Sequence, residues 1–219
     1  MYLPQAFDHP QYARQVMRAH PFASLISNGP DGVPVATGLP LHLVEGGAGG
    51  GGDAGGDTGV RAAESGDVLL GHVALGNPHG RLLAEQPQAL VIFNGPSAYM
   101  SPSVYADQER VPTWSYIRVH AKVTARMVGE AVDKDRLLKH LIGDHEPAYA
   151  AQWRRLSEAY TSGMLKRITA FELRITEVQC ALKLNQHRPE AHAAMAEQLA
   201  AGGPQEQALL AWMKTLRMV

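Results

Sequence analysis

Polar side chains that can bind an anion recur at the ends of the predicted strands of this chain. The candidates are Thr37, His72, Asn77, Arg81, Lys183 and Gln186. Hydroxyl, amide and basic groups that lie close together make charge-assisted hydrogen bonds to an anion. Each residue is ordinary when taken singly, because a lone histidine in a strand is usually a satisfied structural residue. Only a shared position in the fold would make them one site.

An aromatic-rich segment at residues 94–116 is the second candidate surface. Pro96, Pro102 and Pro112 fix φ and remove backbone donors, so we expect a rigid loop rather than a helix or a central strand. Its aromatic side chains have flat apolar faces with polar ends, which suits a planar ligand or a subunit contact. The aromatic residues are Tyr99, Tyr105, Trp114 and Tyr116, and the hydroxyl residue Ser101 lies between the first two. The alternative is a loop that only packs its aromatic rings on the core.

Several familiar catalytic patterns are missing from the sequence. The histidines include no pair at the His-x-x-x-His spacing of a metal-binding helix, so we predict no metal site. No Gly-x-Ser-x-Gly motif is present, which disfavours a serine hydrolase. The glycines of residues 46–59 lack the Lys-Ser/Thr of a phosphate-binding loop. Cys180 lies within a predicted strand and is expected to be a small buried hydrophobe. The sequence therefore names no catalytic residue.

The elements that would position these residues are mostly β-strands. Residues 117–127 alternate strictly, with apolar side chains at odd positions and polar side chains at even positions. This pattern is typical of an antiparallel strand with one buried face, and its length indicates a strand that bends around a barrel. Further candidate strands are residues 22–27, 33–44, 67–74, 89–93 and 171–184. The sequence predicts a mainly β fold with helices (α+β), built on a six-stranded antiparallel barrel.

Helices are expected at the start, in the middle and at the end of the chain. Asp8 can cap a first helix that runs to His20, and residues 131–166 are expected to form a helical insertion. Pro189 can open a helix that ends near residue 200, and another helix follows it. The apolar residues of that last helix are Leu209, Leu210, Trp212 and Met213.

Three segments describe the expected domain organisation. Residues 1–185 form one barrel domain, which carries the helical insertion and a second insertion at residues 46–66. That second insertion is rich in glycine and lacks apolar anchors, so we expect it to be flexible. Residues 186–219 form a helical tail that packs on the barrel or on a partner chain.

The composition limits the classes of partner and the compartment. The 219 residues carry a formal net charge of -1, so charge gives no general attraction to nucleic acid or to an anionic membrane. No apolar run is long enough to span a membrane, and the first residues do not read as a signal peptide. A single cysteine fits a reducing compartment, so we expect a cytoplasmic protein.

Three blocks occur in order along the chain and carry a family resemblance. They are Gly71-His72 with Asn77-Pro78, then Phe93-Asn94-Gly95-Pro96 with Val111-Pro112-Thr113-Trp114, then Lys183-Leu184-Asn185-Gln186. With the opening Met1-Tyr2-Leu3-Pro4, they make the chain resemble the PaiB-type FMN-binding negative transcriptional regulator family over nearly its whole length. The chain departs from that pattern in the glycine-rich insertion and at Asn185, where a serine is expected.

The resemblance implies a split-barrel flavin-binding fold that forms a homodimer with FMN at the subunit interface. It places the phosphate of FMN near Thr37, His72, Asn77 and Arg81. Tyr99, Ser101 and Trp114 would lie near the flavin ring. Lys183 and Gln186 would close the site, either from the same subunit or from the second subunit of the dimer.

The resemblance also implies control of transcription, but no basic recognition helix supports direct DNA binding. Two other functions stay open. One is a flavin-dependent oxidoreductase that acts on a small molecule. The other is a haem-binding or haem-degrading split-barrel protein, in which His72 or His120 would ligate iron.

Overall fold

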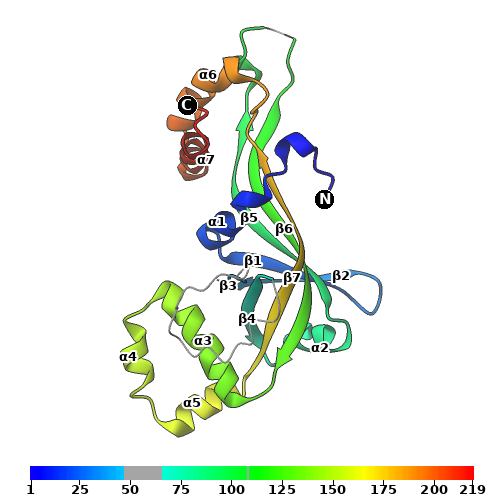
Figure 1. The fold of residues 1–219 in the computed structure, drawn as a ribbon, viewed down its shortest axis with the longest axis vertical. Coiled ribbons are helices and arrows are strands. Elements are labelled where there is room, and N and C mark those ends of the chain that lie inside the picture. Colours follow the sequence, from blue (N-terminus) through cyan, green and yellow to red (C-terminus); the bar gives the residue numbers. More distant parts are fainter. Residues whose placement is uncertain (47–65, 108) are drawn as a thin grey trace. The chain divides into compact units, whose positions relative to one another are not determined.

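A computed structural model describes residues 1–46, 66–107 and 109–219 (Figure 1). The predicted insertion at residues 46–66 lies almost entirely outside the described residues. A seven-stranded sheet with the order β2-β1-β5-β6-β7-β4-β3 dominates the fold. The strands are β1 (Phe22–Asn28), β2 (Pro34–Pro40), β3 (His42–Val44), β4 (Val68–Ala74), β5 (Gln88–Met100), β6 (Thr113–Val128) and β7 (Ile168–Lys183). The strand pairs β1–β2, β1–β5, β3–β4 and β4–β7 are antiparallel, which confirms the predicted fold class.

The number of strands differs from the prediction, which was six. The single strand expected at residues 33–44 is two strands that pair with different partners. Pro40 lies opposite Phe22 of β1, whereas His42 lies opposite Leu70 of β4. Between them, the backbone N–H of Leu41 donates to the carbonyl of Pro21 at 3.0 Å. A change of partner at one residue does not disturb the hydrophobic pattern, so the sequence did not indicate it.

Strand β6 has the alternation that the sequence predicted as far as Val123. Its buried side chains are Ser115, Ile117, Val119, Ala121 and Val123, and the side chains between them are exposed or half-buried. Beyond Val123 the alternation weakens, and Val128 is the next buried residue. One face of this strand therefore belongs to the core, and the other is available for other contacts.

Strand β5 corrects the prediction of a loop that begins at residue 94. The strand continues through Pro96 to Met100. Its buried residues are Val91 and Phe93 and then Pro96, Ala98 and Met100, so the alternation shifts by one position after Phe93. The pairing of β5 with β1 ends at Phe93 in the described part of the chain. Beyond that point the backbone N–H of Ser97 donates to the side chain of Gln205 at 3.3 Å, so a side chain of α7 (Pro204–Thr215) replaces strand pairing there.

Most of the helices match the predicted positions along the chain (Figure 1). They are α1 (Ala13–Ala19), α2 (Pro78–Glu85), α3 (Ala131–His145), α4 (Tyr149–Trp153), α5 (Glu158–Leu165), α6 (His192–Ala200) and α7 (Pro204–Thr215). Helices α3, α4 and α5 occupy the segment predicted as a helical insertion. Helices α6 and α7 occupy the predicted tail.

The first helix does not begin at Asp8, as the sequence indicated. Helix α1 starts at Ala13, after two short 3-10 turns, the second of which opens with Pro10. The side chain of Asp8 accepts a hydrogen bond from the backbone N–H of Cys180 at 3.1 Å, and Asp8 forms a bridge with Ala181. The carboxylate oxygen that would have capped a helix therefore bonds to a residue far away in the sequence.

The chain divides into two compact units, which are described separately. The first unit comprises Met1–Ala19, Asn94–Val119 and Gln179–Val219, and the second comprises His20–Phe93 and His120–Val178. In the first unit, Leu209 and Met213 of α7 are buried. Trp212 meets the ring of Tyr12 edge to face, with the centroids 6.2 Å apart. The tail therefore uses its apolar residues inside its own unit.

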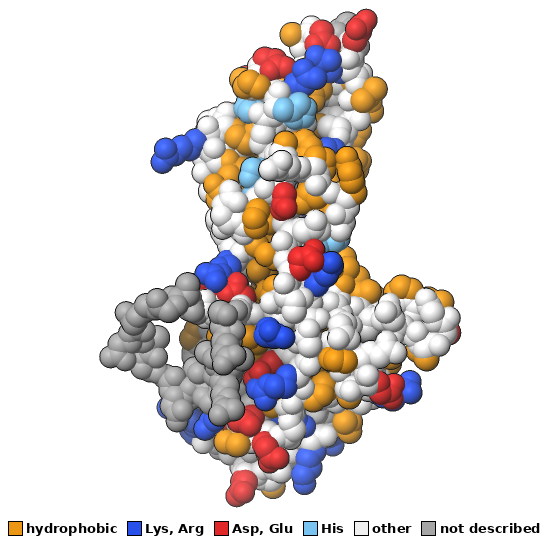
Figure 2. Space-filling view, turned by 45° about the vertical axis from the view of Figure 1, so that its right-hand side comes forward, with side chains coloured by type: hydrophobic (Ala, Val, Ile, Leu, Met, Phe, Trp, Pro, Cys, Tyr) orange, Lys and Arg blue, Asp and Glu red, His pale blue; other side chains and the backbone are white. Residues whose placement is uncertain are grey.

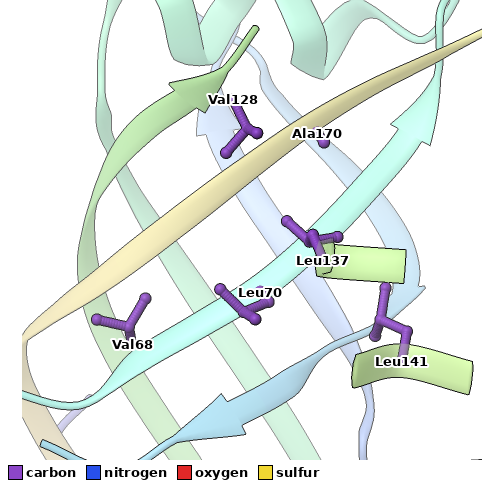
Figure 3. Packing of buried hydrophobic residues seen from close by; sticks show 6 residues of the cluster. All are labelled: Val68, Leu70, Val128, Leu137, Leu141 and Ala170. Atoms are coloured by element: carbon purple, nitrogen blue, oxygen red, sulfur yellow. The ribbon is translucent and has the colours of Figure 1, made fainter. Parts of the chain in front are cut away.

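The second unit has a core in which α3 packs on the sheet (Figure 3). Its members are Val68, Leu70, Val128, Leu137, Leu141 and Ala170. Leu137 and Leu141 lie one turn apart and place their side chains against residues of β4, β6 and β7. Period 3.6 on the helix and period two on the strands bring these apolar faces together.

Candidate functional site

Three side chains of the second unit form a hydrogen-bonded network between β2 and the start of α2. Asn77 is the N-cap of α2, and its Oδ1 accepts a bond from the backbone N–H of His79 at 2.9 Å. Its Nδ2 donates to Oγ1 of Thr37 at 3.3 Å. Oγ1 of Thr37 lies 2.8 Å from Nδ1 of His79. Two of the predicted anion-binding residues, Thr37 and Asn77, are thus joined directly.

The start of α2 has the electrostatic character of an anion site. Its first turn contains no acidic residue, and Pro78 at the first helical position removes a backbone donor that would lack a partner in any case. The helix dipole places partial positive charge at this end. Arg81 lies on the exposed face of the next turn, where its guanidinium is 3.9 Å from the carboxylate of Glu85.

Two histidines of this unit carry ring nitrogens that are buried without a hydrogen-bond partner in the described part of the chain. They are Nε2 of His79 and Nδ1 of His72. Burial lowers the pKa of His72 and of His79 below its ordinary value. Both imidazoles are therefore neutral at pH 7. His72 lies on β4 opposite Ala170 of β7, and no hydrogen bond joins it to Thr37 or Asn77 among the described residues.

In the first unit, the predicted aromatic residues form an exposed pair with a cation nearby. The rings of Tyr99 and Trp114 meet at an interplanar angle of 76°, with their centroids 6.2 Å apart, and are 47% and 56% exposed. Lys183 of β7 donates from Nζ to Oγ1 of Thr113 at 2.6 Å, and its Nζ lies 5.7 Å from the ring centre of Tyr116. Trp114 and Tyr116 project from the same face of β6, because side chains two positions apart share a face.

Ser101 and Gln186, which the sequence also indicated, make mainly local bonds. Oγ of Ser101 accepts from the backbone N–H of Ser103 at 3.2 Å and starts a short 3-10 turn. Oε1 of Gln186 accepts from the backbone N–H of Leu184 at 3.0 Å, and its Nε2 donates to the carbonyl of Leu182. Both side chains therefore shape the backbone around them.

Residues 1–177 match the family described as "Putative FMN-binding domain". The chain belongs to this family. A curated relative, protease synthase and sporulation protein PAI 2 of Bacillus subtilis, is 30% identical over 197 residues. That match covers 87% of this chain and 84% of the relative. The resemblance to the PaiB-type family is thereby confirmed, and FMN is the cofactor of the family.

Solved structures of other flavoproteins share the fold of this FMN-binding family member. The flavocytochrome Anf3 from Azotobacter vinelandii matches with a TM-score of 0.59 at 13% identity, over 84% of this chain and 73% of that one. The FAD and heme binding protein from Mycobacterium smegmatis matches with a TM-score of 0.56 at 18% identity, over 80% and 73%. The predicted split-barrel fold is confirmed, with seven strands in place of six.

The one cysteine of this FMN-binding protein lies in the core. Cys180 is buried as predicted, and burial together with the carboxylate of Asp8 raises the pKa of its thiol to about 12. No group of three or more His, Cys, Asp or Glu side chains in the described ranges is arranged to hold a metal ion. Of the helices in those ranges, none is long and apolar enough to cross a membrane.

Two residues of the FMN-binding protein gain a role that the sequence did not indicate. His79 was not a candidate, although it follows the Asn77-Pro78 pair that opens α2. Asn185 was noted only as a departure from serine. It adopts a left-handed conformation with φ of 59°, and its Nδ2 donates to the hydroxyl of Tyr105 at 2.8 Å. Asparagine is one of the few residues that tolerate this conformation, which accounts for its presence there.

The buried histidines predict that acid destabilises the protein. Burial lowers the pKa of His20, His72, His79 and His140, and the nearby His42 contributes at His140. As the pH falls below about 6.5, the unfolded chain takes up protons that the folded chain refuses. The free energy of unfolding should therefore fall between pH 7 and pH 5.5, by at most about 1.4 kcal/mol per pH unit for each histidine.

Urea denaturation at a series of pH values measures this dependence. A His72→Asn variant should show a shallower dependence than the wild type, since one of the buried titrating groups is gone. A stability that is flat or rises on acidification over this interval would contradict the prediction.

Proposed function

We propose that this split-barrel protein holds the phosphate of FMN at the start of α2 and that its flavin-bound dimer acts in the negative control of transcription. The observation that carries the proposal is the Thr37–Asn77 network at an acid-free helix N-terminus. The phosphate of FMN carries close to two negative charges and accepts several hydrogen bonds. The second amide hydrogen of Asn77 and the hydroxyl of Thr37 are suitable donors, and the positive end of the α2 dipole favours the negative charge. The backbone N–H groups of His79 and Gly80 already donate to Asn77.

The predicted residues contribute to the proposed site in different ways. Thr37 and Asn77 donate hydrogen bonds to the phosphate, and Arg81 adds positive charge from the exposed side of the next helical turn. His72 is neutral and can donate a hydrogen bond without adding charge. Nδ1 of His72 is buried and has no partner in the described part of the chain, so it is able to bond a polar group of a ligand.

The aromatic pair and Lys183 are the groups assigned to the flavin ring. FMN supplies a ring that accepts and releases electrons. Tyr99 and Trp114 offer exposed aromatic faces on which such a planar ring can stack. The ammonium group of Lys183 favours negative charge on a bound ring, since the described hydrogen bond that it makes is to a hydroxyl rather than a carboxylate. Ser101 and Gln186 support the backbone beside these residues.

A role in transcription does not require that this chain read DNA by itself. On the face shown in Figure 2, the described basic and acidic side chains are intermingled and form no continuous basic area. The formal net charge of -1 also gives no general attraction to phosphate backbones. The relative from Bacillus subtilis is named for protease synthase and sporulation, which supports a regulatory role. In this proposal the flavin-bound dimer is the form that controls transcription.

Three measurements, on the purified protein and in cells, test this function against its alternatives. The visible spectrum should show flavin bands, whereas a Soret band would identify the haem-binding alternative. Deletion of the gene should raise the transcript levels of its targets, and a variant that cannot bind FMN should not restore repression. Steady consumption of NAD(P)H with a small-molecule acceptor, together with unchanged transcripts, would identify an oxidoreductase and refute the regulatory proposal.

The exposed apolar side chains of the first unit predict a homodimer. Val111 is 79% exposed, and the neighbouring Trp114 is more than half exposed. We expect a total buried area of about 2,000 Å² or more, which is typical of obligate dimers. Val111→Glu should weaken the dimer. The matched control Val33→Glu, at a 61% exposed position in the second unit, should not.

Light scattering at micromolar concentration gives the mass of each protein. The wild type should have about twice the chain mass of 23.6 kDa. A wild type that remains monomeric at that concentration would refute the dimer.

A further inference from the structure

We propose that His79 is a positioning residue that directs the hydroxyl hydrogen of Thr37 toward the phosphate of FMN. This inference rests on the proposed phosphate site and adds the arrangement of hydrogen atoms within it. His79 lies at the second position of α2 and is fully buried. It touches the network through one ring nitrogen and therefore acts through Thr37.

The orientation of the Asn77 amide is determined by the helix cap. The oxygen that accepts from the backbone N–H of His79 must be Oδ1, because an NH₂ group cannot accept that bond. Nδ2 is then the atom that faces Thr37, and it donates to Oγ1. One lone pair of the hydroxyl is thereby occupied. The question that remains is the direction of the bond between Thr37 and His79.

Two tautomers of neutral His79 are possible, and they leave different atoms without a partner. In the first, Nε2 carries the proton, Thr37 donates to Nδ1, and a buried N–H has no described acceptor. In the second, Nδ1 donates to Oγ1 of Thr37, and only a bare lone pair on Nε2 is buried. Orphaned buried N–H donors are rarer in proteins than under-satisfied acceptors. The second tautomer is therefore favoured.

The second tautomer has a direct consequence for ligand binding. Oγ1 of Thr37 accepts from both Asn77 and His79, so both of its lone pairs are occupied. Its hydrogen is then free to be donated to an additional acceptor. Thr37 is half-buried and stands beside the first turn of α2, where we place the phosphate. The network thus makes the threonine an obligatory donor, which selects a ligand rich in acceptor oxygens.

The first test needs no variant. Long-range ¹⁵N–¹H correlation spectra of the wild type, assigned by comparison with a His79→Asn protein, report which ring nitrogen of His79 carries the proton. Protonated Nδ1 is expected at neutral pH. Protonated Nε2 would overturn the proposal whether or not the protein binds flavin.

The second test compares dissociation constants for FMN and riboflavin, measured by quenching of flavin fluorescence. Thr37→Val should weaken FMN binding about ten- to a hundredfold, since it removes a bond to a charged group. His79→Leu leaves the hydroxyl in place but no longer directs its hydrogen, so it should weaken FMN binding by about three- to tenfold, the cost of an ordinary hydrogen bond. Riboflavin, which has no phosphate, should bind these variants as it binds the wild type. Thr37→Ser keeps the hydroxyl, and His79→Asn keeps an amide donor near the position of Nδ1, so both should retain most of the affinity for FMN.

The two substitutions should also be non-additive. In a Thr37→Val background, His79→Leu should change FMN affinity less than twofold, because the hydroxyl that it positions is already absent. Equal losses of affinity for FMN and riboflavin, or independent losses in the double variant, would overturn the positioning role of His79. The proposal that the wild type binds FMN would still stand. A wild type that binds neither flavin would instead refute the proposed function, and the tautomer measurement would still decide the direction of the Thr37–His79 bond.

Discussion

Replacing Asn77 by aspartate should lower the affinity for FMN by about a hundredfold and leave riboflavin binding close to that of the wild type. Aspartate keeps the oxygen that caps α2 but has no amide to donate, and it places a negative charge beside the proposed phosphate position. Losing a hydrogen bond to a charged group costs about 1.5–3 kcal/mol, and repulsion between like charges adds to the loss. Titration of both flavins by fluorescence measures the difference.

Two matched variants separate the ligand effect from the helix cap. Asn77→Ser keeps a capping oxygen and should weaken FMN binding with little loss of stability. Asn77→Ala removes the cap as well, so it should also lower the free energy of unfolding by about 1 kcal/mol. If Asn77→Asp binds FMN as tightly as the wild type, the phosphate does not lie at the start of α2.

The largest loss of stability is expected from Leu137→Ala, which should lower the free energy of unfolding by about 2–5 kcal/mol. Leu137 is 2% exposed and lies in the cluster between α3 and the sheet (Figure 3). The substitution removes buried apolar surface and leaves a cavity lined by rigid strands, which cannot easily collapse. Urea denaturation measures the change in the free energy of unfolding.

The neighbouring leucine provides the control for this prediction. Leu138 lies on the same helix but is only partly buried at the edge of the cluster, so Leu138→Ala should have a clearly smaller effect. If the two substitutions cost the same, burial in the cluster would not account for the loss, since alanine is the better helix former at both positions. The cluster would then contribute less to stability than its burial suggests.

Local pattern was sufficient for the elements whose side chains alternate or repeat regularly. The buried positions from Ile117 to Val123 in β6 follow from period two, because a half-buried strand must place every second side chain in the core. Helix α3 follows in the same way from its apolar stripe, in which Leu137 and Leu141 are buried. The family blocks carried enough information to identify an FMN-binding split barrel, which the comparisons confirm.

Long-range partners decided the elements that the sequence described wrongly. β5 continues through Pro96 beyond the end of its pairing with β1, where the backbone N–H of Ser97 donates to the side chain of Gln205. Asp8 bonds to the backbone of Cys180 and does not cap a helix. The run at residues 33–44 changes partner at Leu41 and becomes two strands. In each case a residue far away in the sequence supplies the competing bond, and no local propensity contains that information.

The candidate site shows the same division between residue type and position. The sequence by itself determined which side chains can donate to a phosphate, because hydroxyl and amide chemistry belongs to the residue. It could not show that Thr37 and Asn77 are bonded to each other, since they come from β2 and α2. Nor did it single out His79, whose ring reaches Thr37 only when α2 starts beside β2. Hydrogen-bond partners are set by distances of about 3 Å, and only the tertiary structure brings distant segments that close.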